Sequence, residues 1–309
     1  MKHSSLRIAT RKSALALWQA EHVATRLRIL DPERAVELVP LSTQGDRNQQ
    51  DSLANIGGKG LFIKELELAL AEGHADLAVH SMKDVPAELP DGFTIAAVLE
   101  REDPRDAFIA VHHTSFATLP EAARVGSSSL RRQCQLLHRR PDLNVLPLRG
   151  NVDTRLRKLA AGEYDAIILA VAGLKRLGLA DNITAILDTQ TSLPAITQGV
   201  IGIECRIEDT INRELVTRLN HAPTWQRSLA ERALNRALSG SCVVPLAGYA
   251  ELDGEQLHLR GRVGMPDGSR MIEGEISGPA VQAETLGRTL AEDMLARGAG
   301  EVLRHVAGR

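Results

Sequence analysis

The feature that most constrains the fold of this chain is an alternation of apolar, strand-like runs with amphipathic helical patterns. Leu6–Thr10, Val36–Val39 and Asp76–His80 are typical of short buried strands. Helical patterns over about residues 14–27 and 61–70 lie between them. Strands that alternate with helices tend to pair in parallel and to be covered on both faces, so the pattern predicts an α/β fold.

The alternation starts again after a charged, proline-interrupted segment, Arg101–Arg105, where we place a domain boundary. Patterns of strand, turn and helix then repeat to about residue 176. From about residue 222, a helix, three strand-like runs and a long final helix predict a smaller α+β domain. Val200–Cys205 is typical of one more buried strand, but periodicity does not say to which sheet it belongs.

Composition excludes several classes of protein. The chain has 37 Lys and Arg against 39 Asp and Glu, and only two Trp, two Tyr and four Phe, so neither its overall charge nor its aromatic content suits a nucleic-acid partner. The apolar stretch Ala166–Leu174 is too short to cross a bilayer, and the N-terminus lacks an export-signal pattern, so we expect a cytoplasmic protein. Cys134, Cys205 and Cys242 are spaced neither as a disulfide framework nor as zinc ligands, so no metal is expected.

Positive charge is concentrated in one part of this near-neutral chain. Residues 124–176 hold nine Arg and two Lys against four acidic residues, a local net charge of +7, while the whole chain has −2. Within this part, Gly126-Ser-Ser-Ser-Leu-Arg-Arg132 joins a predicted strand to a helix start, where backbone N–H groups and the helix dipole favour an anion. Four arginines follow the C-terminal ends of predicted strands, where open α/β sheets bind ligands: Arg131, Arg132, Arg149 and Arg155. Because guanidinium groups pair well with carboxylates, we predict a polyanionic ligand.

The first predicted domain places cations at the equivalent edge of its sheet. Arg11 follows the first strand, Lys59 lies in a long polar segment, and Lys83 follows the third strand. Asp84 is then a carboxylate among cations. It is either half of a surface ion pair or a proton-transfer group that the cations hold ionised beside a ligand nitrogen.

Two further segments carry alternative interpretations. Residues 42–60 form a polar stretch of 19 residues, typical of a mobile binding loop or of a plain insertion. Its Gly57-Gly-Lys-Gly60 lacks the Ser or Thr and the glycine spacing of a nucleotide-binding loop. Cys242 lies in a turn of small residues, where a thiol is either open to modification or a silent surface group.

Eight motifs follow one another along the chain: Arg7-Ile-Ala-Thr-Arg11, Gly57-Gly-Lys-Gly-Leu-Phe62, Val79-His-Ser-Met-Lys-Asp-Val-Pro86, Arg101-Glu-Asp-Pro-Arg-Asp106, Ser128-Ser-Leu-Arg-Arg132, Leu148-Arg-Gly-Asn-Val152, Leu169-Ala-Val-Ala-Gly-Leu-Lys-Arg176 and the turn at Cys242. In this order they resemble the porphobilinogen deaminase family, also called hydroxymethylbilane synthases. The resemblance covers nearly the whole chain.

The resemblance implies two α/β domains similar to periplasmic binding proteins and a smaller C-terminal α+β domain. We therefore expect domain 1 over residues 1–99 and 200–217, with a mobile loop over 42–60. Domain 2 is expected over residues 100–199, with the arginine-rich cofactor site. Domain 3 is expected over residues 218–309, with the cofactor cysteine.

The resemblance also implies a transferase of tetrapyrrole (haem) biosynthesis. Members join four porphobilinogen molecules head to tail, with loss of ammonia, on a dipyrromethane cofactor that a thioether holds to the cysteine matching Cys242. Water then releases hydroxymethylbilane. Each pyrrole carries an acetate and a propionate, so a six-ring chain brings about a dozen negative charges that cations must screen. A monomer is implied.

The matching motifs assign a role to each candidate residue. The cofactor is expected to contact Ser81, Lys83, Asp84, Ser127, Ser128, Ser129, Arg131, Arg132 and Arg155. Incoming substrate or the growing chain is expected at Arg11, Ser13, Lys59, Arg149 and Arg176. Asp84 is also the expected catalytic group, which faces the pyrrole nitrogens, stabilises the cation left when ammonia departs and transfers protons.

Three residues depart from the usual family pattern. Thr197 stands where Gly is more common, Ser241 stands in place of Gly before the cysteine, and Ser127 replaces Thr but keeps the hydroxyl. Ser241 puts the backbone of the cofactor turn in question if that position needs a positive φ. The alternative function is a two-lobed anion-binding module without catalysis, which would not need Cys242.

Overall fold

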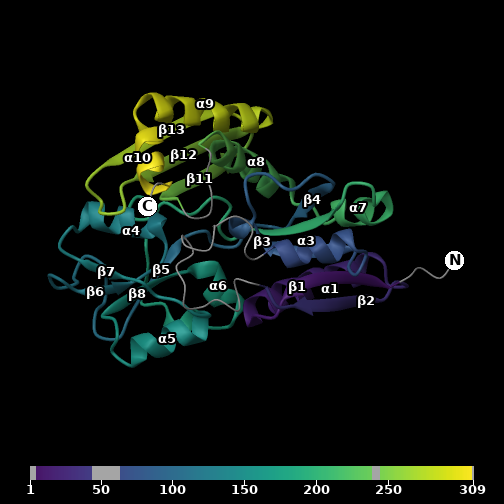
Figure 1. The fold of residues 1–309 in the computed structure, drawn as a ribbon, viewed down its shortest axis with the longest axis horizontal. Helices are drawn as coiled ribbons and strands as arrows, with labels where there is room; N and C mark the ends of the chain where they lie inside the picture. The colour runs from purple at the N-terminus through teal and green to yellow at the C-terminus, as the bar shows by residue number, and fades with distance from the viewer. Residues whose placement is uncertain (1–4, 44–62, 239–243, 308–309) are drawn as a thin grey trace. The chain divides into compact units, whose positions relative to one another are not determined.

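The computed structural model describes residues 5–43, 63–238 and 244–307. The chain divides into two compact units, drawn with their elements labelled in Figure 1. The first unit comprises Met1–Glu102 and Val200–Trp225, and the second comprises Asp103–Gly199 and Gln226–Arg309.

The first unit is built on a five-stranded sheet with the strand order β2-β1-β3-β10-β4. β1 is parallel to β2 and β3, whereas β10 is antiparallel to β3 and β4, so the sheet is mixed rather than parallel throughout. The strands are β1 (Leu6–Arg11), β2 (Val36–Leu41), β3 (Leu77–Ser81), β4 (Phe93–Val98) and β10 (Ile201–Arg206).

Helices cover both faces of this first sheet because successive residues of a strand point to opposite sides. Ile8 shares a buried cluster with Val23 of α1, whereas the next residue, Ala9, packs with Leu66 and Leu70 of α3. The helices of the unit are α1 (Ala14–Leu30), α3 (Lys64–Ala71), α7 (Thr210–Thr217) and the short 3-10 helix η1 (Met82–Asp84).

The second unit contains a similar mixed sheet with the order β7-β6-β8-β5-β9. β6 is parallel to β7 and β8, and β5 is antiparallel to β8 and β9. Phe108 packs with Leu136 of α4 on one face, and Ile109 packs with Leu174 of α6 on the other. The elements are β5 (Asp106–Ala110), β6 (Arg124–Gly126), α4 (Leu130–Arg139), β7 (Asn144–Leu146), α5 (Val152–Ala160), β8 (Ala166–Ala170), α6 (Val171–Arg176), η2 (Ala180–Asn182) and β9 (Ala185–Ile186).

The C-terminal part of the second unit is an antiparallel meander, β11-β12-β13, packed against helices. Leu259 of β12, Leu234 of α8 and Leu290 of α9 share one buried core, and α9 lies over the sheet (Figure 1). The elements are α8 (Ala222–Ala237), β11 (Leu246–Asp253), β12 (Gln256–Gly264), β13 (Met271–Pro279), η3 (Ala280–Gln282), α9 (Ala283–Ala296) and α10 (Ala299–Ala307). The predicted class, α/β followed by a smaller α+β part, is confirmed.

Among residues 5–43, 63–238 and 244–307, no helix combines the length and apolar character that a membrane crossing requires. Within the same ranges, no cluster of three or more His, Cys, Asp or Glu side chains is arranged to hold a metal ion.

Candidate functional site

Five candidate residues lie at one edge of the first unit's sheet. Arg11 is the last residue of β1, and Ser13 caps α1 by accepting a hydrogen bond from the Ala16 backbone N–H at 3.4 Å. Ser81 is the last residue of β3, and Lys83 and Asp84 belong to η1 directly after it. Because β1 and β3 are adjacent parallel strands, their C-terminal ends bring these half-buried side chains to the same edge.

The turn that carries Lys83 and Asp84 is anchored from both sides. Met82 and Val85 flank the pair and are both buried. The Met82 backbone N–H donates to the Val200 carbonyl at 3.0 Å, which ties the turn to the chain just before β10. The Gln19 side chain also donates to Ser81 Oγ at 2.9 Å, so α1 and β3 are held together beside the turn.

A buried histidine–glutamate hydrogen bond next to this edge was not predicted from the sequence. His80 Nε2 lies 2.7 Å from Glu204 Oε2, and both side chains are almost fully buried. The pair joins β3 to β10, whose residues are antiparallel neighbours at Gly202 and His80. It stabilises the strand that leads directly into Ser81 and η1.

The predicted serine turn of the second unit makes a compact connection between β6 and α4. Ser127 Oγ accepts from the Ser129 N–H at 3.3 Å, and Ser129 caps α4 through the Arg132 N–H. Ser128 Oγ both donates to the Leu148 carbonyl and accepts from the Leu148 N–H, each at 3.0 Å. The three hydroxyls therefore shape the turn through backbone contacts.

Arg131 and Arg132, in the first turn of α4, converge on one buried carboxylate. Asp106 is 0% exposed, while Arg131 and Arg132 are 4% and 7% exposed. Arg131 Nη1 lies 2.8 Å from Asp106 Oδ2, and Arg132 Nη2 lies 2.7 Å from Oδ1. The Ser192 hydroxyl and the Gln198 amide also donate to this carboxylate, at 2.7 and 2.9 Å. We call these five residues the Asp106 cluster.

The electrostatics of the Asp106 cluster leave positive charge in excess. Burial alone would raise the pKa of Asp106, but the charges and hydrogen bonds of Arg131 and Arg132 lower it well below its usual range. Burial lowers the pKa of the Arg132 guanidinium; the charge of Asp106 opposes this and the charge of Arg131 adds to it. Two guanidinium groups and one carboxylate sum to +1, which favours a further anion.

The other candidate arginines of the second unit are half-buried. Arg149 lies in the connection between β7 and α5. Arg155 Nε, in α5, donates to the Gly150 carbonyl at 2.8 Å, and Arg176 Nη2, at the end of α6, donates to the Gly199 carbonyl at 2.7 Å. Guanidinium groups pair well with carboxylates, so these three arginines remain candidates for contacts to an anionic ligand.

Sequence reasoning missed Asp106, Ser192 and Gln198. A usable signal existed for Asp106, because it opens the apolar run Ala107–Ala110, and a carboxylate in a buried strand must be paired. Ser192 and Gln198 carry no comparable signal, since both lie outside the regular elements and meet Asp106 only in the folded chain.

The departure at Thr197 has a visible backbone consequence. Thr197 has φ of +55°, in the left-handed region that glycine adopts without strain. Glycine, which the resemblance leads us to expect here, would adopt this conformation without strain, and the Thr197 backbone N–H donates to Glu231 Oε2 at 2.6 Å. The next residue, Gln198, donates to the Pro104 carbonyl and to Asp106.

The cysteines differ in their chemistry. Burial raises the pKa of the Cys134 thiol to about 12 and that of Cys205 to about 11, so neither is a nucleophile near neutral pH. Cys242, like the candidates Lys59 and Ser241 and most of the expected loop 42–60, lies outside the described residues.

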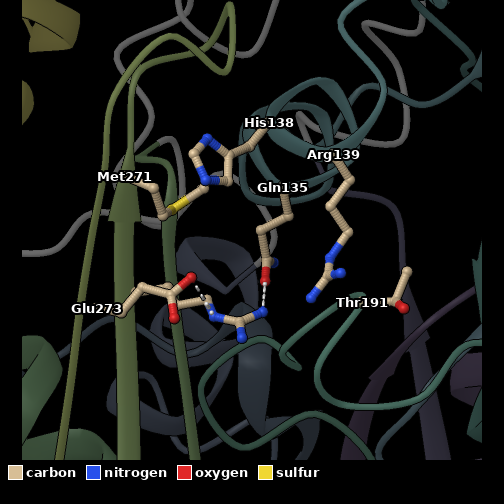
Figure 2. Close-up of a pocket in the computed structure, with 7 residues that line it drawn as sticks. Gln135, His138, Arg139, Thr191, Met271 and Glu273 are labelled. Carbon is tan, nitrogen blue, oxygen red and sulfur yellow. Dashed lines mark hydrogen bonds and ion pairs between the residues drawn. The ribbon is translucent and has the colours of Figure 1, made fainter.

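A pocket of about 270 Å³ lies within the second unit, beside α4 and β13 (Figure 2). Arg262 spans it, donating to Gln135 at 3.0 Å and pairing with Glu273 at 3.2 Å. None of the residues predicted from sequence lines it: Gln135, His138, Arg139, Thr191, Arg262, Met271 and Glu273. Arg262 is paired with Glu273, and Arg139 donates to the Gln190 carbonyl. Because the pocket contains none of the candidate residues, we do not assign the ligand to it.

Several solved structures are similar to this chain at low identity. One is a methionine-binding protein, MetQ, at 14% identity over 75% of this chain and 94% of that chain, with a TM-score of 0.45. Another is a putative methionine-binding lipoprotein from Bacillus subtilis, at 11% identity over 71% and 90% of the two chains, with a TM-score of 0.44. A third is the VFT2 domain of Bordetella pertussis BvgS, in a double mutant, at 14% identity over 70% and 87%, with a TM-score of 0.43.

Two family models match the sequence itself. Residues 6–214 match the porphobilinogen deaminase, dipyromethane cofactor binding domain. Residues 225–296 match the porphobilinogen deaminase C-terminal domain. Together they include the first unit's cationic edge and the Asp106 cluster. The chain therefore belongs to the porphobilinogen deaminase family.

Proposed function

We propose that this chain builds hydroxymethylbilane on a dipyrromethane cofactor whose carboxylates bind at Arg131 and Arg132. The reaction itself follows from the family: a transferase condenses four porphobilinogen molecules head to tail and releases ammonia. The roles of individual residues are our proposal.

The observation that carries this proposal is the excess charge of the Asp106 cluster. Two almost fully buried arginines share one carboxylate, so among the described residues this cluster carries one positive charge in excess of its carboxylate, in a low-dielectric setting. A buried charge of this kind is costly unless an anion joins it. A cofactor that carries acetate and propionate groups supplies such an anion, so the residues present fit the group.

The remaining candidate residues are assigned to the cofactor or to the substrate. We assign Ser81, Lys83, Asp84, Ser127, Ser128, Ser129 and Arg155 to the cofactor together with the arginine pair. Arg11, Ser13, Lys59, Arg149 and Arg176 are assigned to incoming substrate and the growing chain. When bound, the cofactor supplies a nucleophilic pyrrole carbon at which the first new carbon–carbon bond forms.

We assign the proton-transfer role to Asp84. It is half-buried, lies in the short turn that follows β3, and is the neighbour of Lys83 in the sequence. As a carboxylate it accepts a hydrogen bond from a pyrrole N–H and stabilises the positive charge that develops as ammonia leaves the substrate. It then accepts the proton that the coupled pyrrole carbon must lose.

Cys242 is the proposed attachment point. Its sulfur forms a bond to the methylene carbon of a porphobilinogen as the bond from that carbon to ammonia breaks, and the thiol proton leaves with the ammonia. The raised pKa values of Cys134 and Cys205 support this choice, since a thiol must ionise to attack.

Intact-protein mass spectrometry tests the function directly. The chain purified from a host that makes porphobilinogen should carry an added mass of two porphobilinogens less two ammonias. Cys242→Ser should lose this mass, while the matched control Cys205→Ser should keep it. An unmodified wild-type chain would instead favour the anion-binding module without catalysis.

The domain limits, compartment and oligomeric state belong to the same proposal. We propose domains over 1–99 with 200–217, 100–199 and 218–309, in a cytoplasmic monomer. The three separate sheets support three domains, although the last two group into one compact unit. Light scattering of the purified chain should give the mass of one copy, and a dimer mass would refute the monomer.

A further inference from the structure

The Asp106 carboxylate accepts more hydrogen bonds than an ordinary ion-pair partner does. Its Oδ1 accepts from Arg131 Nη2, Arg132 Nε, Arg132 Nη2 and Gln198 Nε2 at 3.2, 3.1, 2.7 and 2.9 Å. Its Oδ2 accepts from Arg131 Nη1 and Ser192 Oγ at 2.8 and 2.7 Å. A carboxylate has about four lone-pair directions, so Asp106 has no capacity for another donor. Its contacts therefore define where both guanidinium groups lie.

Backbone carbonyls complete the frame around the two arginines. Arg131 Nη1 donates to the Leu193 carbonyl at 2.8 Å, and Arg132 Nη1 donates to the Ile168 carbonyl at 3.0 Å. Neutral acceptors orient a guanidinium group without cancelling its charge. Several contacts therefore orient the two guanidinium groups. Within the described residues, Asp106 is the one acidic group that pairs with either of them.

We propose that Asp106 is the positioning residue of the cofactor site. It aligns Arg131 and Arg132 and cancels one of their two charges, so that one positive charge remains for a cofactor carboxylate. Ser192 and Gln198 hold the carboxylate of Asp106 in the orientation that this task requires. The inference rests on the proposed function, because it assigns the Asp106 cluster to that cofactor.

Cofactor loading gives the first test. Apo-protein from a host that lacks porphobilinogen is mixed with porphobilinogen, and loading is followed by intact mass. Asp106→Asn should raise the concentration for half-maximal loading at least tenfold, because the two guanidinium groups lose their common acceptor. Asp165→Asn is the matched control, since Asp165 pairs with Arg124 at the surface of the same unit, and its value should stay within twofold of wild type.

Two variants with smaller changes test the proposal if Asp106→Asn does not fold. Ser192→Ala and Gln198→Leu each remove one donor from Asp106 while leaving all three charges in place. Each should raise the half-maximal concentration about threefold and leave the maximal loading rate close to wild type. A purely structural role would lower stability without changing the half-maximal concentration of the folded protein, and that result in both variants overturns the proposal.

Anion dependence gives a test that needs no cofactor. Replacing Asp106 with a neutral residue changes the charge of the cluster from +1 to +2. An anion that binds the cluster should therefore stabilise the folded apo-protein of the variant more than that of wild type. The melting temperature of apo Asp106→Asn should rise more in inorganic phosphate, relative to chloride of equal ionic strength, than that of wild type or Asp165→Asn. Equal shifts in all three proteins refute the charge assignment. Wild type that never gains mass would refute the proposed function, while this phosphate comparison would still decide the role of Asp106.

Discussion

At the scale of single residues, burial divides the charged candidate residues into a group that folding encloses and a group that solvent reaches. Asp106, Arg131 and Arg132 are nearly inaccessible and are held by several contacts each. Lys83 and Asp84 are half-buried in a short turn. Folding fixes the contacts of the first group, whereas the side chains of the second group are partly open to solvent.

Asp84→Asn tests the proton-transfer role. The amide keeps the size of the side chain but can neither accept a proton nor stabilise a cation, so turnover should fall about 100-fold or more. The cofactor mass should remain, because the arginines proposed to bind its carboxylates are unchanged. Asp91→Asn, an exposed aspartate of the same unit, is the control and should be near normal. Near-normal bilane formation by Asp84→Asn would remove Asp84 from the chemistry.

The sequence supports predictions at single residues where a motif is local. The neighbours Lys83 and Asp84, and likewise Arg131 and Arg132, can be singled out because each pair lies in one short stretch after a strand. Asp106 is 25 residues from Arg131, and Ser192 is 86 residues from Asp106. Only the pairing of strands and the packing of α4 bring them together, so their roles are not readable from spacing.

At the scale of elements, the turn η1, which carries Lys83 and Asp84, depends on a strand from a distant part of the chain. β10 pairs with β3, and Gly202 in β10 leaves the space that Met82 fills. The apolar run at Val200–Cys205 predicts this strand, but not its antiparallel place between β3 and β4. β4 itself (Phe93–Val98) was missed, because its first four residues are only half-buried and show no clear alternation.

Gly202→Ala tests this support. An added Cβ would lie 2.1 Å from Met82 Sδ, so Met82 must move and shift η1. We expect a loss of about 1–3 kcal/mol in the free energy of unfolding, measured in urea, together with a lower kcat. Gly300→Ala is the control, since its Cβ would meet side-chain atoms only at 3.4 Å and alanine favours a helix. Equal stability of the two variants contradicts the close packing.

At the scale of the whole molecule, the chain is nearly neutral, but its positively charged residues are unevenly distributed along the sequence. A net charge of −2 coexists with a local excess of +7 over residues 124–176. This distribution keeps the attraction for polyanions local, and it requires buried carboxylates to stay ionised as partners of the buried cations. The stability of the folded chain should therefore depend on pH through Asp106.

The direction of that dependence follows from the pKa of Asp106. Burial alone would raise it, but Arg131 and Arg132 lower it well below the unfolded value of about 3.9. The ion pairs thus contribute fully above the unfolded pKa, and the contribution is lost as the pH falls towards the folded pKa. Urea unfolding should show wild type more stable than Asp106→Asn by about 3–5 kcal/mol at pH 7 and 5, with a shrinking difference below pH 4. Asp165→Asn, at an exposed pair, should cost under about 1 kcal/mol throughout. If the difference in free energy of unfolding between wild type and Asp106→Asn is as large at pH 3 as at pH 7, the ionised form of Asp106 does not stabilise the fold through the two arginines.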